Sequence, residues 1–341
     1  MTPVDLSRSV VRALRRAVED GELPVGVVAP ERVVVERTRP GGVGDYASPV
    51  AFGVAKGAGV APRAVAEVLA SRLAGLPGIE RVEITGAGFL NFVLAETSVA
   101  EYVRSIRAGA GGVELYGFAA PGTPPSTAEV GGELRECVVR AAVQRIVRSQ
   151  GVGVGESGAA VRVAPVAKRD GDVRARFGAG AAAWAMLSVP GHETPVFPAW
   201  LLVQDESSEF FRVRYALDRA RALTRNAGQL GFRGEPGELG EPGEPGESGE
   251  VRGADALLAA LRDQPLVLEA AAHHRAPERL VRQLVVIADA LLDFQYHVLP
   301  RGDEKPSAAH RARLALAEAA GAVLAGGLAL LGIDAPDDHH L

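Results

Sequence analysis

The segment IERVEITGAGFLNFVL, residues 79–94, decides the fold of the first third of the chain. Apolar and polar residues alternate over 79–85 and again over 89–94, which is the pattern of half-buried strands. The glycine-rich turn at 86–88 joins the two runs, so the segment predicts a β-hairpin.

Two helices and a further strand are predicted before this hairpin. Residues 6–19 and 62–73 each place their apolar side chains on one helical face, and Pro62 is suited to a helix start. The run RVVVER, residues 32–37, predicts a strand that ends in a turn at 41–44. We therefore expect a small α+β domain over residues 1–107.

Residues 108–204 are rich in glycine, proline and alanine and give a weaker pattern. One helix is predicted, over about 132–149. The run Gly151, Gly153 and Gly155 has phosphate-loop spacing, but it follows a helix instead of linking a strand to a helix start. It therefore favours a simple turn.

The remainder of the chain, residues 205–341, predicts an all-α bundle. Pro265 separates two expected helices at 254–261 and 266–274, and Ser307 is a suitable N-cap for a last helix. The expected buried faces of the other helices are Phe210, Val213, Leu217, Ala220 and Thr224, and then Leu280, Leu284, Ile287, Leu291 and Phe294.

An acidic insert interrupts this half of the chain. Residues 234–251 read GEPGELGEPGEPGESGEV and carry six glutamates. We expect a disordered spacer here, because six acidic triplets are too few and too self-repelling for a collagen-like helix. The formal net charge is −5 and becomes +1 without those six charges. Binding to a nucleic acid would therefore depend on local basic patches.

The composition favours a cytoplasmic protein. We find no run of about 18 apolar residues, so we expect no membrane span and no membrane partner. The N-terminal stretch lacks the core and cleavage site of a signal peptide. The single cysteine, Cys137, cannot form an internal disulfide. The seven histidines form no metal constellation, and we expect no metal site.

Both ends of the chain resemble arginyl-tRNA synthetases. The resemblance at the front is to that family's N-terminal domain, and at the back to its DALR-type anticodon-binding domain. The segments that carry it are Gly44-Asp45-Tyr46-Ala47, GAGFLNF at 86–92, FFRVRYALDRARALTR at 210–225, HRARL at 310–314 and GGLALLGIDAP at 326–336.

The middle of the chain departs from that family. The segment VGGELR, residues 130–135, stands where the family has the His-x-Gly-His motif that stabilises the phosphates of ATP, and Val130 and Glu133 replace the two histidines. Lys168 and Arg169 faintly resemble the second ATP motif. Only 33 positions separate Arg135 from Lys168, and a doubly wound nucleotide-binding fold needs several units of about 30 residues. We therefore expect 108–204 to be a degenerate remnant of the catalytic domain, with no catalytic residues and no cofactor.

The resemblance implies contacts with tRNA by residues that can stack on bases or neutralise phosphate. Each has an alternative, since Phe89 suits a strand core, Tyr215 suits a helix interface and the arginines suit a solvated helix face. Asp218, Asp337 and Asp338 place acids where the family meets RNA. The candidates are Tyr46, Phe89, Asn91, Arg212, Arg214, Tyr215, Arg219, Arg279, Arg282, Arg311 and Arg313.

Three hypotheses follow from these residues. The first is a pseudoenzyme that binds tRNA, in particular arginine tRNA, and cannot aminoacylate alone. The second is a component of arginine–tRNA ligation that acts with another polypeptide and, in that case only, uses ATP. The third is a protein-interaction module that has lost RNA binding.

Overall fold

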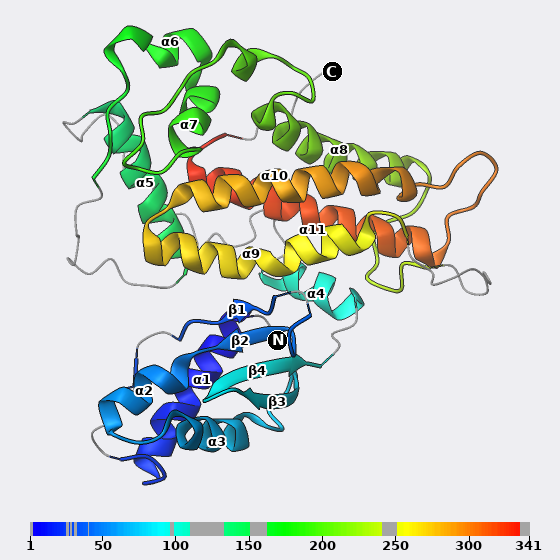
Figure 1. The fold of residues 1–341 in the computed structure, drawn as a ribbon. Coiled ribbons are helices and arrows are strands. Elements are labelled where there is room, and N and C mark those ends of the chain that lie inside the picture. Colours follow the sequence, from blue (N-terminus) through cyan, green and yellow to red (C-terminus); the bar gives the residue numbers. More distant parts are fainter. Residues whose placement is uncertain are drawn as a thin grey trace. The chain divides into compact units, whose positions relative to one another are not determined.

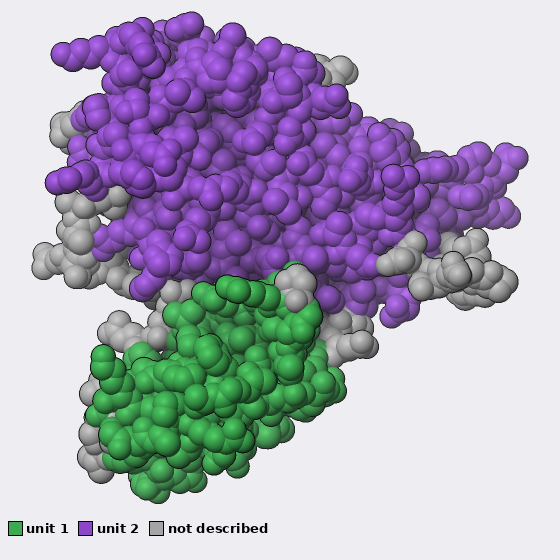
Figure 2. Space-filling view, viewed as in Figure 1, with its two compact units in different colours: residues 1–98 green, residues 99–341 purple. Residues whose placement is uncertain are grey.

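The computed structural model describes residues 3–24, 27, 29–30, 33–39, 41–95, 99–109, 133–150, 162–240 and 251–334. The chain forms two compact units, residues 1–98 and 99–341 (Figure 2). We describe each unit by itself.

The first unit is a small antiparallel sheet with helices (Figure 1). In its described part, the strands are β1 (Glu36–Arg37), β2 (Tyr46–Ser48), β3 (Ile79–Thr85) and β4 (Phe89–Leu94), in the order β1-β2-β4-β3. The helices are α1 (Pro3–Glu19), α2 (Val50–Ala58) and α3 (Pro62–Leu73). Helices α2 and α3 pack against the sheet, and α1 packs against α3. The core lies between them and includes Leu14, Leu69, Leu90 and Phe92, all fully buried.

Two residues of the Gly44-Asp45-Tyr46-Ala47 segment join β2 to β4. Gly44 has a φ of +75°, and a Cβ atom there would lie 2.7 Å from the carbonyl oxygen of Phe92. Asp45 donates its backbone N–H to that same oxygen at 2.8 Å, and its carboxylate accepts the N–H of Leu94 at 2.8 Å. Only glycine fits both the conformation and the close approach, so this segment determines how β2 enters the sheet.

The hairpin and the helix at 62–73 are confirmed, and the predicted strand at 32–37 is wrong in length. Of the described residues in this run, 33–37, only Glu36 and Arg37 join the sheet. Val33 and Val35 are buried, as an alternating strand would be, but serine hydroxyls take two of the carbonyls in this run. Ser7 donates to Val33 O at 2.8 Å and Ser48 donates to Val34 O at 2.7 Å. Side chains thus satisfy the backbone that a strand would have paired.

The second unit is helical and shares one continuous apolar core. The four long helices α8 (Glu209–Gln229), α9 (Ala254–His274), α10 (Pro277–Phe294) and α11 (Ala308–Leu331) pack along one another (Figure 1). The predicted stripe on α10 is confirmed, because all five of its residues are fully buried. Ser307 caps α11 as predicted, in a capping box with His310. The smaller elements are α4 (Val99–Gly109), α5 (Leu134–Ser149), η1 (Lys168–Asp170), α6 (Val173–Phe177), α7 (Ala179–Leu187), η2 (Ala199–Leu202) and η3 (Gln295–His297).

The prediction of two helices around Pro265 was wrong, because α9 continues through the proline. A proline inside a helix removes one backbone hydrogen bond and costs about 3 kcal/mol. The packing of α9 along α10 offsets that cost, with Leu257, Leu261 and Leu268 buried. Near Pro265, Gln283 of α10 donates a hydrogen bond from its side-chain amide to Ala260 O at 2.7 Å. Tertiary contacts thus override the local signal.

The described residues between 99 and 204 belong to the core of the second unit. Val103 and Ile106 of α4, Ile146 of α5, and Trp184 and Met186 of α7 are all buried in it. The unit boundary lies at 98, not at the predicted 107, because α4 packs against α11. The middle stretch therefore contributes to a compact domain over the residues that the structure describes.

The expectation of a disordered insert at 234–251 was wrong for its first part. Residues 234–240 pack on α11, where Glu235 donates its backbone N–H to Arg311 O at 3.1 Å. Arg313 donates from Nε to Leu239 O at 2.7 Å, and the side chain of Leu239 is buried. Residues 241–250 lie outside the described residues.

Helix α11 is long and apolar enough to cross a membrane by length and composition alone, which we did not expect from the sequence. Within the second unit, 83% of its most apolar window is buried. The same composition is typical of a core helix.

Candidate nucleic-acid interface

The arginines of α8 mostly have partners within the protein. Arg212 forms a bidentate ion pair with Asp289 of α10, at 2.8 Å from Nε and 3.3 Å from Nη2, and it donates to Glu206 O at 2.7 Å. Arg214 lies over the ring of Phe210, with 5.5 Å to the ring centre. Arg212 was a predicted RNA contact, but its donors join two helices instead.

Tyr215 and Arg219 lie one turn apart on α8. The ring of Tyr215 stacks on Phe211 with 5.6 Å between ring centres, and the residue stays half-buried. Arg219 donates from Nε to Gln295 Oε1 at 2.6 Å, at the start of η3. This contact brings the two predicted residues to the edge where α8 meets η3.

Tyr296 is the functional candidate that the sequence reasoning missed. Its ring is 64% exposed, next to the residue that holds Arg219. Arg301 donates from Nε to its backbone carbonyl at 3.1 Å. A signal was present, because Tyr296 is an aromatic residue that follows the apolar stripe of α10 and falls outside its spacing.

Several arginines lie close to η3. Burial, followed by the charges of Arg301, Arg313 and Arg252, lowers the pKa of His297 below its ordinary value. Arg313 is half-buried and donates to His297 O at 3.4 Å as well as to Leu239 O. We call Tyr215, Arg219, Tyr296, Arg301 and Arg313 the η3 surface.

The other predicted arginines, Arg279, Arg282 and Arg311, are not part of the η3 surface. Arg279 and Arg282 are exposed near the start of α10, and Arg282 lies 13 residues before Gln295, or about 20 Å along a helix. Arg311 is half-buried beside residues 234–240, to which its carbonyl is bonded. The structure therefore does not bring these residues together with Arg219.

In the first unit, two of the three predicted contact residues are buried. Tyr46 and Asn91 are each 5% exposed, and Asn91 donates to Thr85 Oγ1 at 2.7 Å. Their burial contradicts a direct stacking role. Phe89 is 45% exposed and lies against Phe52 with 4.8 Å between ring centres. The core interpretation of Phe89 is wrong, and an aromatic pair remains at the surface.

Two family models match the chain. The model for the arginyl tRNA synthetase N terminal domain covers residues 5–94, and the model for the DALR anticodon binding domain covers residues 213–338. These two stretches of the chain are thus similar to domains of arginyl-tRNA synthetases. In that family the anticodon-binding domain contacts tRNA.

Known proteins with similar sequences match a shorter part of the chain than the two family models together. An arginine–tRNA ligase of Frankia alni is 54% identical over 121 residues, which are 35% of this chain and 21% of the relative. One from Renibacterium salmoninarum is 44% identical over 107 residues, 31% of this chain and 20% of the relative. The matches thus span about a fifth of the length of these relatives.

A solved structure supports the fold. The arginyl-tRNA synthetase of Thermus thermophilus aligns with 99% of this chain and 100% of its own, at a TM-score of 0.52 and 15% identity. At that identity the likeness concerns the fold alone.

Glu133, which the sequence resemblance placed at the first ATP motif, has a structural role. Val130 lies outside the described residues. Glu133 is the N-cap of α5, where its Oε2 accepts the N–H of Glu136 at 3.2 Å, and its Oε1 accepts the N–H of Val166 at 3.0 Å. Both oxygens of this carboxylate thus bind backbone N–H groups.

Arg135, two residues later, is fully buried and serves as a hub of hydrogen bonds. Its guanidinium donates to Met186 O at 3.2 Å, Ala164 O at 2.8 Å and Pro190 O at 3.0 Å, and also to Gly191 O and Glu193 O. Burial lowers its pKa, partly offset by the charges of Glu133, Glu278 and Glu193. Its donors hold the backbone that follows α7.

Lys168 and Arg169, the residues that resemble the second ATP motif, are exposed in η1. They follow Val166, whose N–H is held by Glu133, so one hydrogen bond joins the start of α5 to the segment just before η1. Among the residues that the structure describes, no three His, Cys, Asp or Glu side chains are grouped as a metal site would require.

Proposed function

We propose that this protein binds tRNA, in particular arginine tRNA, through the η3 surface and does not aminoacylate it alone. The observation that carries the proposal is the contact of Arg219 with Gln295, the residue before the exposed Tyr296, while Tyr215 lies one turn before Arg219 on α8. The presence of the two family domains supports the choice of RNA.

The chemistry of this edge suits a single-stranded loop. Unpaired bases stack on aromatic rings, while arginines neutralise the phosphates between them. Tyr296 offers a ring face, and Arg301 and His297 lie beside it in the chain, with Arg313 bonded to His297 O. We expect one or two bases of the loop to be held here.

Asp218 does not oppose this proposal strongly. Its carboxylate lies 3.6 Å from Arg221 on the same helix, and this pair is mostly covered. The negative charge that the sequence places near Tyr215 therefore has a neighbouring cation.

The roles of Glu133 and Arg135 support the absence of catalysis. A carboxylate in place of a motif histidine would repel the phosphates of ATP, and both of its oxygens are engaged by backbone N–H groups. The N–H groups of Arg135 donate hydrogen bonds to carbonyl oxygens inside the protein. Neither side chain is placed to bind a nucleotide triphosphate.

The exposed aromatic pair of Phe52 and Phe89 is a second candidate contact with tRNA. The resemblance of the first domain implies that it meets the elbow of the RNA. Phe89 offers the ring face that buried Tyr46 does not.

A second candidate function is a subunit that completes another polypeptide. Exposed apolar side chains crowd the remnant of the catalytic domain at Val196, Trp200, Leu202 and Val203. Such a cluster is typical of protein contact surfaces. Binding of ATP and arginine by a two-chain complex, and by neither chain alone, would favour this candidate.

The test is equilibrium binding of the full chain to arginine tRNA and to an unrelated tRNA over a salt series. Tyr296→Ala is the informative variant, since its ring is exposed. Leu230→Ala is the matched control, because Leu230 is a 51% exposed apolar residue elsewhere on the unit. Selective, salt-sensitive binding that Tyr296→Ala weakens supports the proposal. Equal affinity for both tRNAs, or no binding at low salt, overturns it.

A further inference from the structure

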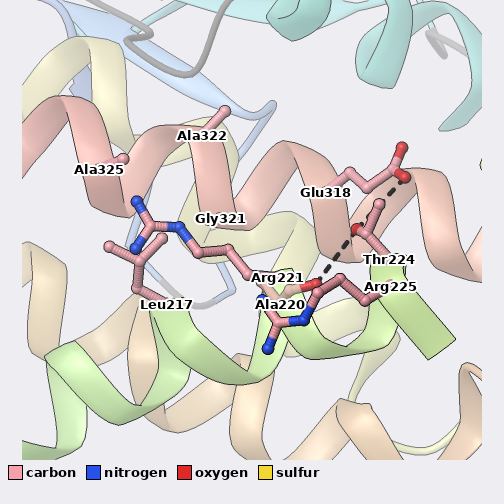
Figure 3. A pocket seen from close by; sticks show the side chains of 9 residues that line it. All are labelled: Leu217, Ala220, Arg221, Thr224, Arg225, Glu318, Gly321, Ala322 and Ala325. Atoms are coloured by element: carbon pink, nitrogen blue, oxygen red, sulfur yellow. Dashed lines mark hydrogen bonds between the residues drawn. The ribbon is translucent and has the colours of Figure 1, made fainter. Parts of the chain in front are cut away.

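A groove separates α8 from α11 on the second unit. It encloses a cavity of about 430 Å³ (Figure 3). Its floor is apolar and consists of Leu217, Ala220, Gly321, Ala322 and Ala325. This edge of α8 faces α11, whereas Arg212 and Arg219 bond to α10 and η3. The groove is therefore separate from the η3 surface.

Small residues keep the floor flat. A Cβ atom at Gly321 would lie 2.9 Å from the Cβ of Ala220, so α8 and α11 approach closely at this point. The floor residues at 220, 321, 322 and 325 carry at most a methyl group, and Leu217 supplies the one larger apolar side chain. Such a floor suits a flat ring.

One end of the groove carries a positioned carboxylate. Glu318 of α11 lies with its Oε1 3.4 Å from the hydroxyl of Thr224, and that hydroxyl donates to Ala220 O at 3.2 Å. A Cβ atom at Gly234 would overlap the carboxylate, so the backbone of the segment after α8 closes against it. Glu318 thus presents an acceptor at this end.

Two guanidinium groups line the α8 side. The Arg221 side chain extends along the groove toward Ala325, away from Glu318, and Arg225 lies below it (Figure 3). Arg221 also faces Asp218 at 3.6 Å, and a guanidinium has five N–H donors to share. Facing groups are thus Arg221 and Arg225 from α8 and Glu318 from α11, and with Asp218 beside Arg221 the four charges sum to zero.

We propose that this groove binds one guanine nucleotide. The base lies on the apolar floor, its N–H edge donates to Glu318, and its phosphate meets Arg221 and Arg225. The volume falls in the range of small-molecule sites, about 300–1,000 Å³. A carboxylate accepts from both N–H groups of the guanine edge, whereas the adenine ring nitrogen at the same place is an acceptor and would be repelled.

The nucleotide has two sources, a free mononucleotide or a guanosine within single-stranded RNA. Only the second source rests on the proposed function. Binding of GMP, of AMP and of a U-rich hexanucleotide with or without one guanosine distinguishes them. Tighter binding of the guanosine hexanucleotide than of GMP assigns the site to RNA, and the reverse order assigns it to the free nucleotide.

The test uses the full chain and five variants. We expect Glu318→Gln to weaken GMP binding by about tenfold and to change AMP binding little, since it loses a charged acceptor. Arg225→Ala should weaken GMP binding but not guanosine binding. Glu209→Gln and Arg104→Ala are matched controls, because both residues are exposed and lie outside the groove.

Two results overturn the proposal. One is equal affinity for GMP and AMP, and the other is unchanged GMP affinity in Glu318→Gln. Ala322→Leu fills the groove and leaves every charge in place. If the base lies in the groove, this variant must also weaken GMP binding. It thus excludes binding by charge alone. Loss of GMP binding with intact tRNA binding contradicts this inference alone. Loss of tRNA binding with intact GMP binding contradicts the proposed function alone.

Discussion

Arg135 donates a hydrogen bond from Nε to the carbonyl oxygen of Met186 at 3.2 Å, although the two residues lie 51 positions apart. The remaining donors of this guanidinium serve the carbonyls of Ala164, Pro190, Gly191 and Glu193. One buried cation therefore fixes α5, the end of α7 and the segment after it.

We expect Arg135→Lys to lower the free energy of unfolding by at least about 3 kcal/mol. A lysine keeps the charge but has three donors on a single nitrogen, so several buried carbonyls lose their partners. Urea unfolding of the full chain, followed by circular dichroism, measures the change. Arg104→Lys is the control, because Arg104 is an exposed residue of α4. Equal midpoints for the two variants would contradict the hub role.

Gly44→Ala should destabilise the first unit by about 2 kcal/mol or more. The new methyl group would sit in a left-handed backbone, 2.7 Å from Phe92 O. Amide hydrogen exchange in β2 and β4 reports on this unit alone. Gly53→Ala in α2 is a matched control that should stabilise by about 0.5–1 kcal/mol, since its space is open and alanine favours a helix. Similar protection in both variants would refute the prediction.

Tyr296→Ala should weaken the binding of arginine tRNA by about 1–3 kcal/mol, which is the contribution of one stacked base. The melting temperature should hardly change, because the ring is 64% exposed. Tyr296→Phe keeps the ring face and should bind nearly as the parent does. A Tyr296→Phe variant as weak as Tyr296→Ala would argue for a hydroxyl contact instead of stacking.

His297 should make the second unit less stable as the pH falls. Burial and then Arg301, Arg313 and Arg252 lower its pKa in the folded state below the ordinary 6.5. The unfolded chain therefore binds the proton more readily, and the stability present above about pH 6.5 is lost progressively below that value. Urea midpoints at pH 7.5 and pH 5.5 test this.

His297→Gln is the companion variant, because glutamine does not titrate. Its midpoint should fall less between the two pH values than that of the parent. An equal fall in both proteins would assign the pH dependence to other groups.

Local sequence patterns correctly predicted the helices and strands that depend mainly on their own residues. The hairpin at 79–94, the helix at 62–73 and the α10 stripe have the predicted bounds or buried residues. Local patterns gave wrong predictions where a residue distant in sequence determines the structure. At Pro265, packing on α10 lets helix α9 continue through the proline. At Val33, the backbone carbonyl accepts a hydrogen bond from the Ser7 hydroxyl.

The sequence predicted which types of residue would form the candidate site, but not which individual residues lie together on the surface. Arginines on α8 and an aromatic residue among them indicated an RNA-facing helix. The sequence could not show that Arg212 is paired with Asp289, 77 positions later, or that Tyr46 and Asn91 face inward. Nor did the sequence reasoning single out Tyr296, although its place outside the spacing of the α10 stripe was a signal.

The two backbone N–H groups held by Glu133 make a substitution at this position costly for the fold. A substitution such as Glu133→His, which would rebuild one motif position, would release the N-cap of α5 at a cost of about 0.5–2 kcal/mol. It would also free Val166, and with it the segment that leads to Lys168. The stability of this part of the fold therefore depends on a carboxylate at position 133.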